Sequence, residues 1–372
     1  MIQARLEPTS QLMDDFARAT GVTGNSPPRR YLWTDAHAVC NWLALERELA
    51  DPSYLDLAVS LVAQVHEVLG RHRPDDARSG WISGLSESEG AQHPTSGGLR
   101  IGKPRPERRA ADPSDEQAEW QQDGQYYHYL TRWQHALYRM ALRTGEADYL
   151  RWAVELALAA HQSFRARSGP PRLYWKMSID LRYPLVASSG HHDPLDGLIS
   201  SLVLRSGRED QQLDRVIADL GGLCRGRDWI TDDSLGIGGL MFDACRLAQL
   251  QQTSPDPGLA DLLTEILNAV STGLFRFIRS DTLRLPANYR LAFRELGLAI
   301  GLWGFEVIEE CQPDSRALSA LAAIRPYLGV RELIEEFWLQ PLHQSGPTWV
   351  DHQDINSVML ATSLTRAAFL TI

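Results

Sequence analysis

The chain has 372 residues, of which 44% are hydrophobic and 23% are charged, and its formal net charge is −10. This composition is typical of a globular protein with a large core, and the acidic balance argues against a general nucleic-acid binder, which would present a basic face. The four cysteines are scattered and form no CxxC pair, so we expect reduced core residues rather than a zinc site or a disulfide framework: Cys40, Cys224, Cys245 and Cys311.

The amino-terminal segment, residues 1–16, lacks the apolar core of a signal peptide. The longest apolar run, residues 296–305, is far too short to span a bilayer. We therefore expect a cytoplasmic protein whose partners are neither membranes nor nucleic acids. The first predicted element is a helix around residues 10–19.

One joint then recurs along the chain: an apolar helix end, a short polar turn and a second helix. It occupies residues 45–61, 139–156, 202–220, 246–266 and 307–324. Each turn carries Gly, Pro, Asp or Ser, which end one helix and cap the next. The apolar residues on both sides follow helical spacing, and no alternating strand pattern runs through any joint. The sequence therefore predicts a series of helical hairpins.

The helix before each turn is apolar on more faces than the helix after it, as in residues 296–308 compared with residues 53–69. A helix that is apolar on most faces must be buried on most faces, so each hairpin is predicted to contain an inner and then an outer helix. Long connections lead to the next inner helix, and such loops tend to be functional. They run over residues 71–124, 167–191, 225–231, 280–289 and 325–350.

A sixth inner helix is predicted at residues 353–370, and the helix around residues 10–19 is its expected outer partner. This arrangement resembles the six-hairpin (α/α)6 toroids of the helical glycosidases and of the N-acylglucosamine 2-epimerase group. The resemblance rests on architecture and covers nearly the whole chain. It implies an all-α protein with a single (α/α)6-toroid domain over residues 1–372, and it implies a sugar-active function. An open helical solenoid is the alternative.

Polar residues gather at the predicted starts of the inner helices. In a closed ring these starts would surround one pocket, and carboxylates, imidazoles and guanidiniums above aromatic walls are typical of a small-molecule site. The candidates for catalysis are Asp123, His128, His192, Asp193, Asp196, Asp351, His352 and Asp354. The candidates for substrate binding are Trp81, Tyr126, Trp175, Arg290, Arg294, Glu295 and Trp349.

Several of the carboxylates have a structural alternative. Asp193 precedes Pro194, as an N-cap residue often does. Asp233, or its neighbour Asp232, and Asp351 are also placed to cap helices. Asp354 falls in a first helical turn, where the helix dipole favours a negative charge.

Two clusters are harder to explain by capping. Residues 191–196 hold two histidines and two aspartates, and capping accounts for only one of these four groups. His128, Arg132 and His135 form a polar stripe on an inner helix, where a solvated face is not expected. Both clusters are therefore predicted to face a pocket.

Two arginines open the fifth inner helix against its dipole, immediately before an apolar run. Buried guanidiniums need a carboxylate or phosphate partner. For Arg290 and Arg294 that partner is either Glu295 with a neighbouring aspartate, or an anion or hydroxyl of the ligand.

The connection at residues 71–124 is rich in Gly, Ser and Pro at first and charged at its end. We expect a lid over the pocket, with Trp81 stacking on a sugar, and the alternative is a disordered insertion. Residues 97–103 match GxxxxGK, but Pro104 follows and no strand precedes them, so a nucleotide-binding loop is not expected. The glycines at 236–239 sit within a helical pattern and are expected to allow close helix packing.

The leading hypothesis is glycoside hydrolysis, which needs two carboxyl groups on opposite sides of the scissile bond. We expect one from the second or third helix start and one from the sixth. The second hypothesis is sugar epimerisation or isomerisation, in which His128, His192 or His352 moves a proton and Arg290 or Arg294 polarises the carbonyl. The resemblance to the epimerase group implies such histidines on inner helices.

A non-catalytic sugar-binding or scaffold protein is the third hypothesis. A metal site is conceivable where His191, His192 and Asp193 meet His352 or Asp354, but we expect no metal and no cofactor. The expected partner is a small sugar or an oligosaccharide.

Overall fold

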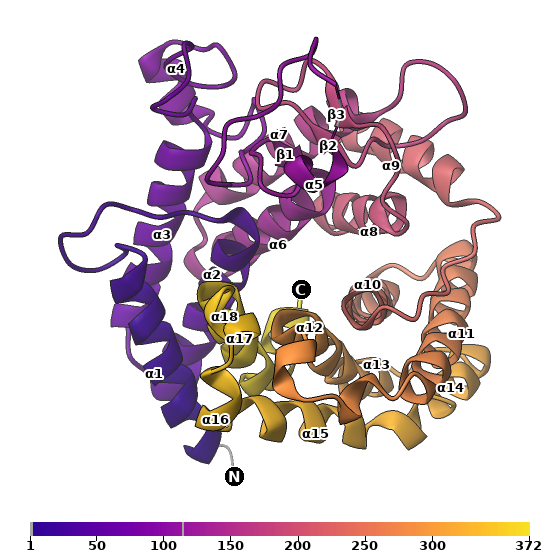
Figure 1. The fold of residues 1–372 in the computed structure, drawn as a ribbon. Coiled ribbons are helices and arrows are strands. Elements are labelled where there is room, and N and C mark those ends of the chain that lie inside the picture. Colours follow the sequence, from indigo (N-terminus) through magenta and orange to yellow (C-terminus); the bar gives the residue numbers. More distant parts are fainter. Residues whose placement is uncertain (1–2, 114) are drawn as a thin grey trace. The chain divides into compact units, whose positions relative to one another are not determined.

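The structure, a computed structural model, describes residues 3–113 and 115–372, and most of its regular elements are helices (Figure 1). Its amino-terminal part contains α1 (Gln3–Ala19), α2 (Leu32–Leu49), α3 (Ser53–Leu69), α4 (Glu87–Gln92), α5 (Glu116–Glu119), β1 (Gln125–Tyr126), α6 (Tyr127–Thr144), α7 (Ala147–Phe164), β2 (Lys176–Met177), β3 (Pro184–Val186), α8 (Asp193–Arg205) and α9 (Gln211–Cys224). The remainder contains α10 (Ser234–Thr253), α11 (Pro257–Arg279), η1 (Thr282–Arg284), η2 (Ala287–Tyr289), α12 (Ala292–Leu302), α13 (Gly304–Glu310), α14 (Ser315–Ala322), η3 (Arg325–Tyr327), α15 (Gly329–Trp338), α16 (Pro341–Gln344), α17 (Pro347–Val350), α18 (Gln353–Leu364) and η4 (Arg366–Leu370). Met1, Ile2 and Ser114, which belong to the predicted domain 1–372 and in part to the predicted connection 71–124, lie outside the described residues.

The predicted helical hairpins are confirmed, and their turns use the expected chemistry. Gly145 ends α6 in the left-handed conformation, with φ of 73°, which a residue without Cβ adopts at little cost. Asp210, Asp256 and Asp314 each accept hydrogen bonds from backbone N–H groups in the first turn of the following helix. These local contacts explain why the turns could be located from the sequence.

The division into inner and outer helices is also confirmed. In α2 every residue from Leu32 to Leu45 is buried, and α10 is buried on most of its faces. By contrast α9 and α11 bury one stripe and leave the opposite face exposed. Gly238 of α10 lies against the backbone of Gly297 and Gly301 of α12, where a Cβ would meet the Gly297 carbonyl oxygen at 2.1 Å. Of the glycines at 236–239, Gly238 therefore has the predicted role in close helix packing.

Four details differ from the prediction. The fifth inner helix is broken at Trp303 into α12 and α13. The sixth ends at Leu364, because Arg366 adopts a left-handed φ of 57° and a short 3-10 turn follows. The predicted connection 325–350 contains a further helix, α15, which packs on α12 and α18. Strands β1, β2 and β3, which were not predicted, form a small antiparallel sheet in the order β1-β2-β3.

The described chain divides into two compact units, and the boundary passes through α1 and α2. Unit 1 comprises residues 3–16, 47–50 and 226–372, and unit 2 comprises residues 17–46 and 51–225 apart from Ser114. In unit 1, α12 lies between α10, α15 and α18. In unit 2, α6 packs on α7 and α8, and the small sheet with α5 lies beside α6 and α7 (Figure 1).

The long connection of unit 2 is folded over its described residues, 71–113 and 115–124. Ser86 and Glu89 form a capping box at the start of α4, and Leu99 and Ile101 are fully buried. Arg100 donates hydrogen bonds to the carbonyl oxygens of Arg71 and Val68 and so ties the connection to the end of α3. The described part of this segment is therefore not a disordered insertion, and its role as a lid stays a prediction. Within residues 3–113 and 115–372, no helix is both long and apolar enough to cross a membrane.

Candidate functional site

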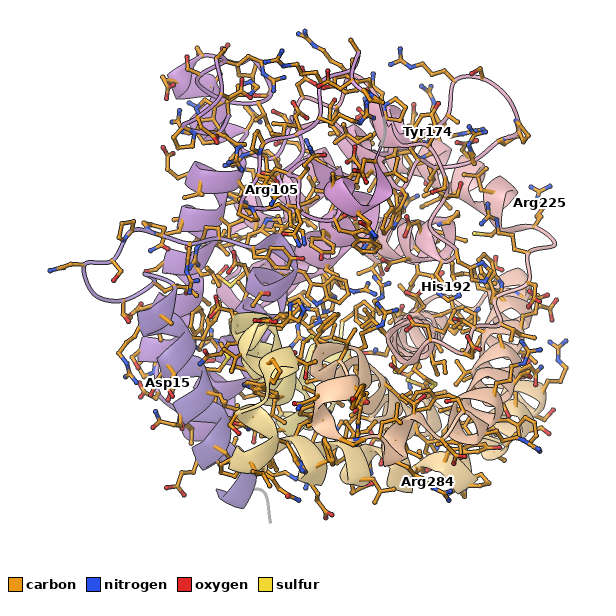
Figure 2. The ribbon with its side chains drawn as sticks, viewed as in Figure 1. Asp15, Arg105, Tyr174, His192, Arg225 and Arg284 are labelled. Atoms are coloured by element: carbon orange, nitrogen blue, oxygen red, sulfur yellow. The ribbon has the colours of Figure 1, made fainter. Side chains whose placement is uncertain are left out.

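The site is built around His128, at the start of α6 in unit 2. Its ring Nδ1 lies 3.5 Å from Oδ1 of Asp193, the first residue of α8, and 26% of the His128 side chain is exposed. The other carboxylate oxygen, Oδ2, lies against Gly190, where a Cβ would come within 2.2 Å of it. An imidazole and a carboxylate from two adjacent inner helices thus form a pair that is open on one side. Figure 2 marks His192, the N-cap residue of α8 next to this pair.

Aromatic rings surround His128. Tyr126 and Trp175 stack on it, with ring centroids at 5.4 Å and 6.3 Å. Trp33 and Tyr129 meet it edge to face, at 6.1 Å and 5.0 Å. The sheet supplies part of this arrangement, because β1 pairs Tyr126 with Lys176 of β2, the residue after Trp175. Trp175 is half-buried, so one face of this aromatic cluster remains available to a ligand.

Three buried polar atoms in this cluster have no hydrogen-bond partner among the described residues. They are the hydroxyl of Tyr126, Nε1 of Trp33 and Oδ2 of Asp193. The three residues are only 3%, 6% and 5% exposed in that order, and each contacts His128. Unpaired buried polar groups are costly in a folded protein. Two donors and one acceptor thus remain unpaired in the three side chains that contact His128.

A second carboxylate, that of Asp196, lies one helical turn from Asp193 and is bound to side chains of α6. Asp196 accepts hydrogen bonds from Nη1 of Arg132, at 2.8 Å, and from the hydroxyl of Thr131. Both donors come from α6, so this contact fixes α6 against α8 next to the His128–Asp193 pair. The guanidinium of Arg132 also lies 5.5 Å from the centroid of the Trp33 ring. Asp196 therefore positions the site rather than offering an open oxygen.

Burial sets the protonation of the neighbouring groups. It raises the pKa of Tyr126 well above the ordinary value, so the phenol remains a hydrogen-bond donor at neutral pH. Burial is also the main cause that lowers the pKa of Lys176, although hydrogen bonds from its ammonium group to Glu119 oppose this change. The Lys176 ammonium lies 5.6 Å from the centroid of the Tyr126 ring.

The structure brings five of the predicted site residues together in unit 2, namely Tyr126, His128, Trp175, Asp193 and Asp196. Asp123 has another role. It is fully buried and accepts hydrogen bonds from Arg100 at 2.6 Å and from the backbone N–H groups of Gly102 and Lys103. Its carboxylate anchors the long connection, so we leave Asp123 out of the candidate site.

Two of the predicted stacking residues are core residues. Trp81 is 4% exposed and packs against Gly90, with the Arg71 guanidinium 4.2 Å from its ring centroid. Trp349 is 3% exposed and stacks on Trp338. Neither ring has a free face for a sugar.

The structural alternative holds for the two arginines of the fifth inner helix. Arg290 forms a two-point ion pair with Glu295, at 2.8 Å and 2.6 Å, and both residues are 2% exposed. Arg294 binds Asp233, and Asp233 also accepts a hydrogen bond from the Gly236 N–H group as the N-cap of α10. The predicted cap at Asp233 is confirmed.

The other capping predictions are wrong. The N-cap residue of α8 is His192 and not Asp193, and the N-cap residue of α18 is His352 and not Asp351. Asp193 instead turns its carboxylate towards His128. The imidazole of His352, in unit 1, meets Phe293 edge to face at 5.6 Å.

Asp354 stands in the first turn of α18, as expected, and it is half-buried. His191 is exposed and its ring contacts that of His192 at 4.5 Å. Among residues 3–113 and 115–372, no group of three or more His, Cys, Asp or Glu side chains is arranged to hold a metal ion.

Sequence reasoning missed three aromatic members of the site. Trp33, Tyr31 and Tyr129 were not among its candidates. Trp33 stands at the start of the first inner helix and Tyr129 flanks His128 in the sequence, so the rule that selected helix starts could have found both. No local pattern marks Tyr31, whose hydroxyl meets that of Tyr129 at 2.5 Å across 98 residues of sequence.

Two buried histidines predict a loss of stability in acid. Burial lowers the pKa of His37 and of His66 from 6.5 to about 3. Below pH 6.5 the unfolded chain therefore binds protons that the folded chain does not, and stability falls as the pH drops towards 3, by about 1.4 kcal/mol per pH unit for each histidine. We expect the free energy of unfolding, measured with urea between pH 7 and pH 5, to fall accordingly.

The variant His66→Gln isolates one of these histidines. His66 Nε2 accepts a hydrogen bond from Nε1 of Trp133 at 3.2 Å, and a glutamine carbonyl is able to accept it instead. The slope of the free energy of unfolding against pH measures how many protons the chain takes up when it unfolds, and in this variant that number should fall by up to one. An unchanged slope would show that His66 does not contribute to acid unfolding.

Solved structures share the fold of this chain. A cellobiose 2-epimerase from Spirochaeta thermophila has a TM-score of 0.52 and 12% identity, with 97% of this chain and 96% of that chain covered. An inactive variant of an α-1,6-mannanase from Salegentibacter sp., in complex with α-1,6-mannotriose, has a TM-score of 0.55 and 12% identity, with 99% of this chain and 100% of that chain covered. A family 76 α-mannanase from Bacteroides thetaiotaomicron has a TM-score of 0.54 and 10% identity, with 99% and 96% covered.

These likenesses confirm the expected fold class, because the solved structures are (α/α)6-toroid proteins and match nearly the whole chain. At 10–12% sequence identity, these likenesses show that the fold is shared and do not show that the activity is. The sequence matches no protein-family model and no curated protein.

Proposed function

We propose that this protein is a sugar-active enzyme that moves a proton on its substrate, as a sugar epimerase or isomerase does, with His128 and Asp193 as the acid–base pair. One observation carries the proposal. The imidazole of His128 is 26% exposed, its Nδ1 lies 3.5 Å from Oδ1 of the buried Asp193, and four aromatic rings line it. The half-buried ring of Trp175, which lies parallel to the His128 imidazole, suits the apolar face of a pyranose.

The chemistry follows from the properties of each group. His128 takes a proton from the carbon next to the sugar carbonyl, and the electron pair of the broken C–H bond moves onto the carbonyl oxygen to give an enediolate. Asp193 stabilises the resulting imidazolium. The Tyr126 phenol, which burial keeps protonated, donates a hydrogen bond to oxygen in the substrate. If the enediolate turns its other face to the His128 imidazolium before the proton returns to the same carbon, the product is an epimer. Return of the proton to the neighbouring carbon, with transfer of the adjacent hydroxyl proton to the former carbonyl oxygen, gives an isomer.

A hydrolase needs a different arrangement, in which two carboxyl groups flank the scissile bond. Within the described part of unit 2, Asp193 is buried with one oxygen 3.5 Å from His128, and Asp196 is bound to Arg132 and Thr131, so neither carboxylate is placed to face the other across a substrate. This contrast favours proton transfer by an imidazole over a carboxylate pair.

Glycoside hydrolysis is the second candidate, and one observation favours it. Asp193 supplies a carboxyl group beside the partly exposed His128, and a glycosidase uses a carboxyl group as its acid or nucleophile. The proteins that share the fold agree with both candidates, since a cellobiose 2-epimerase and an α-1,6-mannanase both act on carbohydrates.

Proton NMR in deuterated water tests the proposal. The purified protein is incubated with mono- and disaccharides that carry neutral, carboxylate or phosphate groups, and each spectrum is followed over time. Exchange of one ring proton for deuterium, together with signals of a second sugar, is the expected result. New anomeric signals from shortened glycans, without exchange at carbon, would favour hydrolysis instead. Unchanged spectra across the whole panel would contradict both candidates.

A further inference from the structure

The chain has a marked preference for arginine. Of its 37 Lys and Arg residues only Lys103 and Lys176 are lysines. Both lie beside the candidate site. The ammonium of Lys103 is 5.2 Å from the centroid of the Tyr31 ring, and that of Lys176 is 5.6 Å from the centroid of the Tyr126 ring. Lysine presents a compact point charge, whereas the planar guanidinium of arginine favours fixed two-point contacts.

The two ammonium groups differ in their partners. Lys176 is fully buried and donates hydrogen bonds to Glu119 Oε2 at 2.9 Å and to the carbonyl oxygens of Glu119 and Gln122. Lys103 is half-buried, and its ammonium forms no ion pair with any carboxylate of the described residues. Lys176 is thus a structural cation, and Lys103 is a cation with an open side.

The backbone of Lys103 is held firmly. Its N–H group donates to Asp123 Oδ1, and its carbonyl oxygen accepts a hydrogen bond from Arg73 Nη1 at 2.7 Å. The preceding Gly102 lies so close to the Arg30 carbonyl oxygen that a Cβ would come within 2.1 Å of it. The side chain therefore starts from a fixed point of the connection, not from a mobile loop.

The surrounding charges leave Lys103 in excess. Arg100 pairs with Asp123, Arg73 pairs with Asp75 and at a longer distance with Asp123, and Lys176 pairs with Glu119. The positive charge of Lys103 acts on the neighbouring Lys176. Burial is the main cause that lowers the pKa of Lys176, and repulsion from Lys103 lowers it further. A half-buried cation that has no ion pair and lies beside an aromatic site suits a bound anion.

Contacts between rings connect Lys103 to His128. The Tyr31 ring under the ammonium meets Tyr129 at 5.6 Å, and Tyr129 meets His128 at 5.0 Å. We propose that the substrate is an anionic sugar, which carries a carboxylate or a phosphate group, and that Lys103 binds this group while His128 faces the reacting carbon. This inference rests on the proposed function, of which it names the substrate class.

The test compares matched sugars by titration calorimetry at low salt. Each set contains a neutral pyranose, its uronate and its 6-phosphate, for glucose, mannose and galactose. We expect the anionic member of at least one set to bind the wild-type protein about 10–100-fold more tightly than its neutral counterpart. The variant Lys103→Met should lose this preference, and Lys103→Arg should keep most of it. Whether the uronate or the phosphate is preferred identifies the anion.

A matched control removes a similar cation elsewhere. Arg279 of α11 lies 5.2 Å from the ring centroid of Phe275, the same separation as that of Lys103 from Tyr31. Arg279→Met changes the net charge equally and should leave the preference for anionic sugars unchanged. Equal loss in both variants would show a general charge effect and would overturn the assignment of Lys103.

Amine acetylation gives an independent readout in the wild-type protein. Because Lys176 is fully buried, Lys103 is the one lysine open to an acetylating reagent, and peptide mass spectrometry follows its modification. The anionic sugar that binds best should slow acetylation of Lys103, and the matched neutral sugar should not. Equal rates with both sugars would contradict the proposal.

Failure of this inference differs from failure of the proposed function. If neutral sugars bind and react as well as anionic ones, and Lys103→Met does not alter this, the anionic substrate is excluded while the sugar-active function stands. If no sugar of the panel binds or reacts, the proposed function fails and the inference fails with it.

Discussion

Replacing His128 with asparagine is expected to lower kcat/KM for the sugar substrate by about 10²–10⁴-fold, the usual contribution of a positioned acid–base group. His128 is the imidazole that the aromatic rings of Tyr126 and Trp175 face, and Asp193 lies 3.5 Å from its Nδ1 atom. Asparagine keeps a polar side chain but cannot carry a proton between two carbon positions. The measurement is the initial rate of deuterium exchange into the sugar, followed by NMR.

The variant Asp193→Asn separates the two candidate reactions. If His128 moves the proton, the loss of its carboxylate partner should lower the rate by a similar factor without abolishing exchange, because the imidazole remains. If Asp193 is the acid of a hydrolase, Asp193→Asn should remove activity while His128→Asn retains a measurable part. Equal activity of both variants and the wild type would overturn the assignment of the site.

A second His–Asp pair in unit 2 provides the control. His161 of α7 lies 3.1 Å from Asp219 of α9, with Nε2 and Oδ2 as the contacting atoms. This pair belongs to the outer helices. His161→Asn should therefore leave kcat/KM within a factor of about two of the wild-type value.

Replacing Arg290 with methionine is expected to destabilise the protein by about 3–5 kcal/mol, because it leaves the carboxylate of Glu295 buried without its cation. The two side chains form two hydrogen bonds, and both residues are 2% exposed. The guanidinium also lies 3.7 Å from the ring centroid of Phe337, a contact that methionine replaces only in part. The free energy of unfolding, or the midpoint of thermal unfolding, measures the effect.

Arg294 provides the matched comparison for this prediction. It forms an ion pair with Asp233, but the two side chains are 39% and 35% exposed. Solvent screening should limit the effect of Arg294→Met to about 1 kcal/mol or less. In the double variant Arg290→Met, Glu295→Gln, removal of the buried charge should restore part of the stability. Equal effects of the two arginine variants would show that burial does not govern these pairs.

Some elements of the fold could be predicted from the sequence and others could not. The turns and helix ends were predicted correctly because the residues that form them are neighbours in the chain, such as Asp256 and Leu259 or Asp314 and Ala317. The distinction between inner and outer helices was also visible, since burial on all faces leaves an apolar run without periodicity. The strands were missed because strands of two or three residues are too short to display an alternating pattern.

The capping predictions show where local reasoning ends. Asp233 and Asp193 both precede or open an inner helix, and only Asp233 accepts a hydrogen bond from its own helix. The Asp193 carboxylate turns away to His128, a residue 65 positions earlier, and lies against Gly190. An aspartate at a helix start is able either to cap its own helix or to contact a residue of another element. Its tertiary neighbours decide between the two, and the local sequence does not contain them.

The predicted site differs from the observed one because contacts between distant residues are not visible in the local sequence. The sequence by itself determined a series of helical hairpins with buried inner helices and with polar and aromatic residues at their starts, because periodicity and turn chemistry act over a few residues. Only the tertiary structure decided which of those polar residues keep an open atom. Asp123 and Arg290 are bound to partners inside the protein, while the side chains of His128 and Lys103 stay partly exposed and Asp193 leaves one oxygen without a partner among the described residues. The partners that decide this come from distant parts of the chain, as Arg132 and Asp196 do, and fold-wide packing alone brings them together.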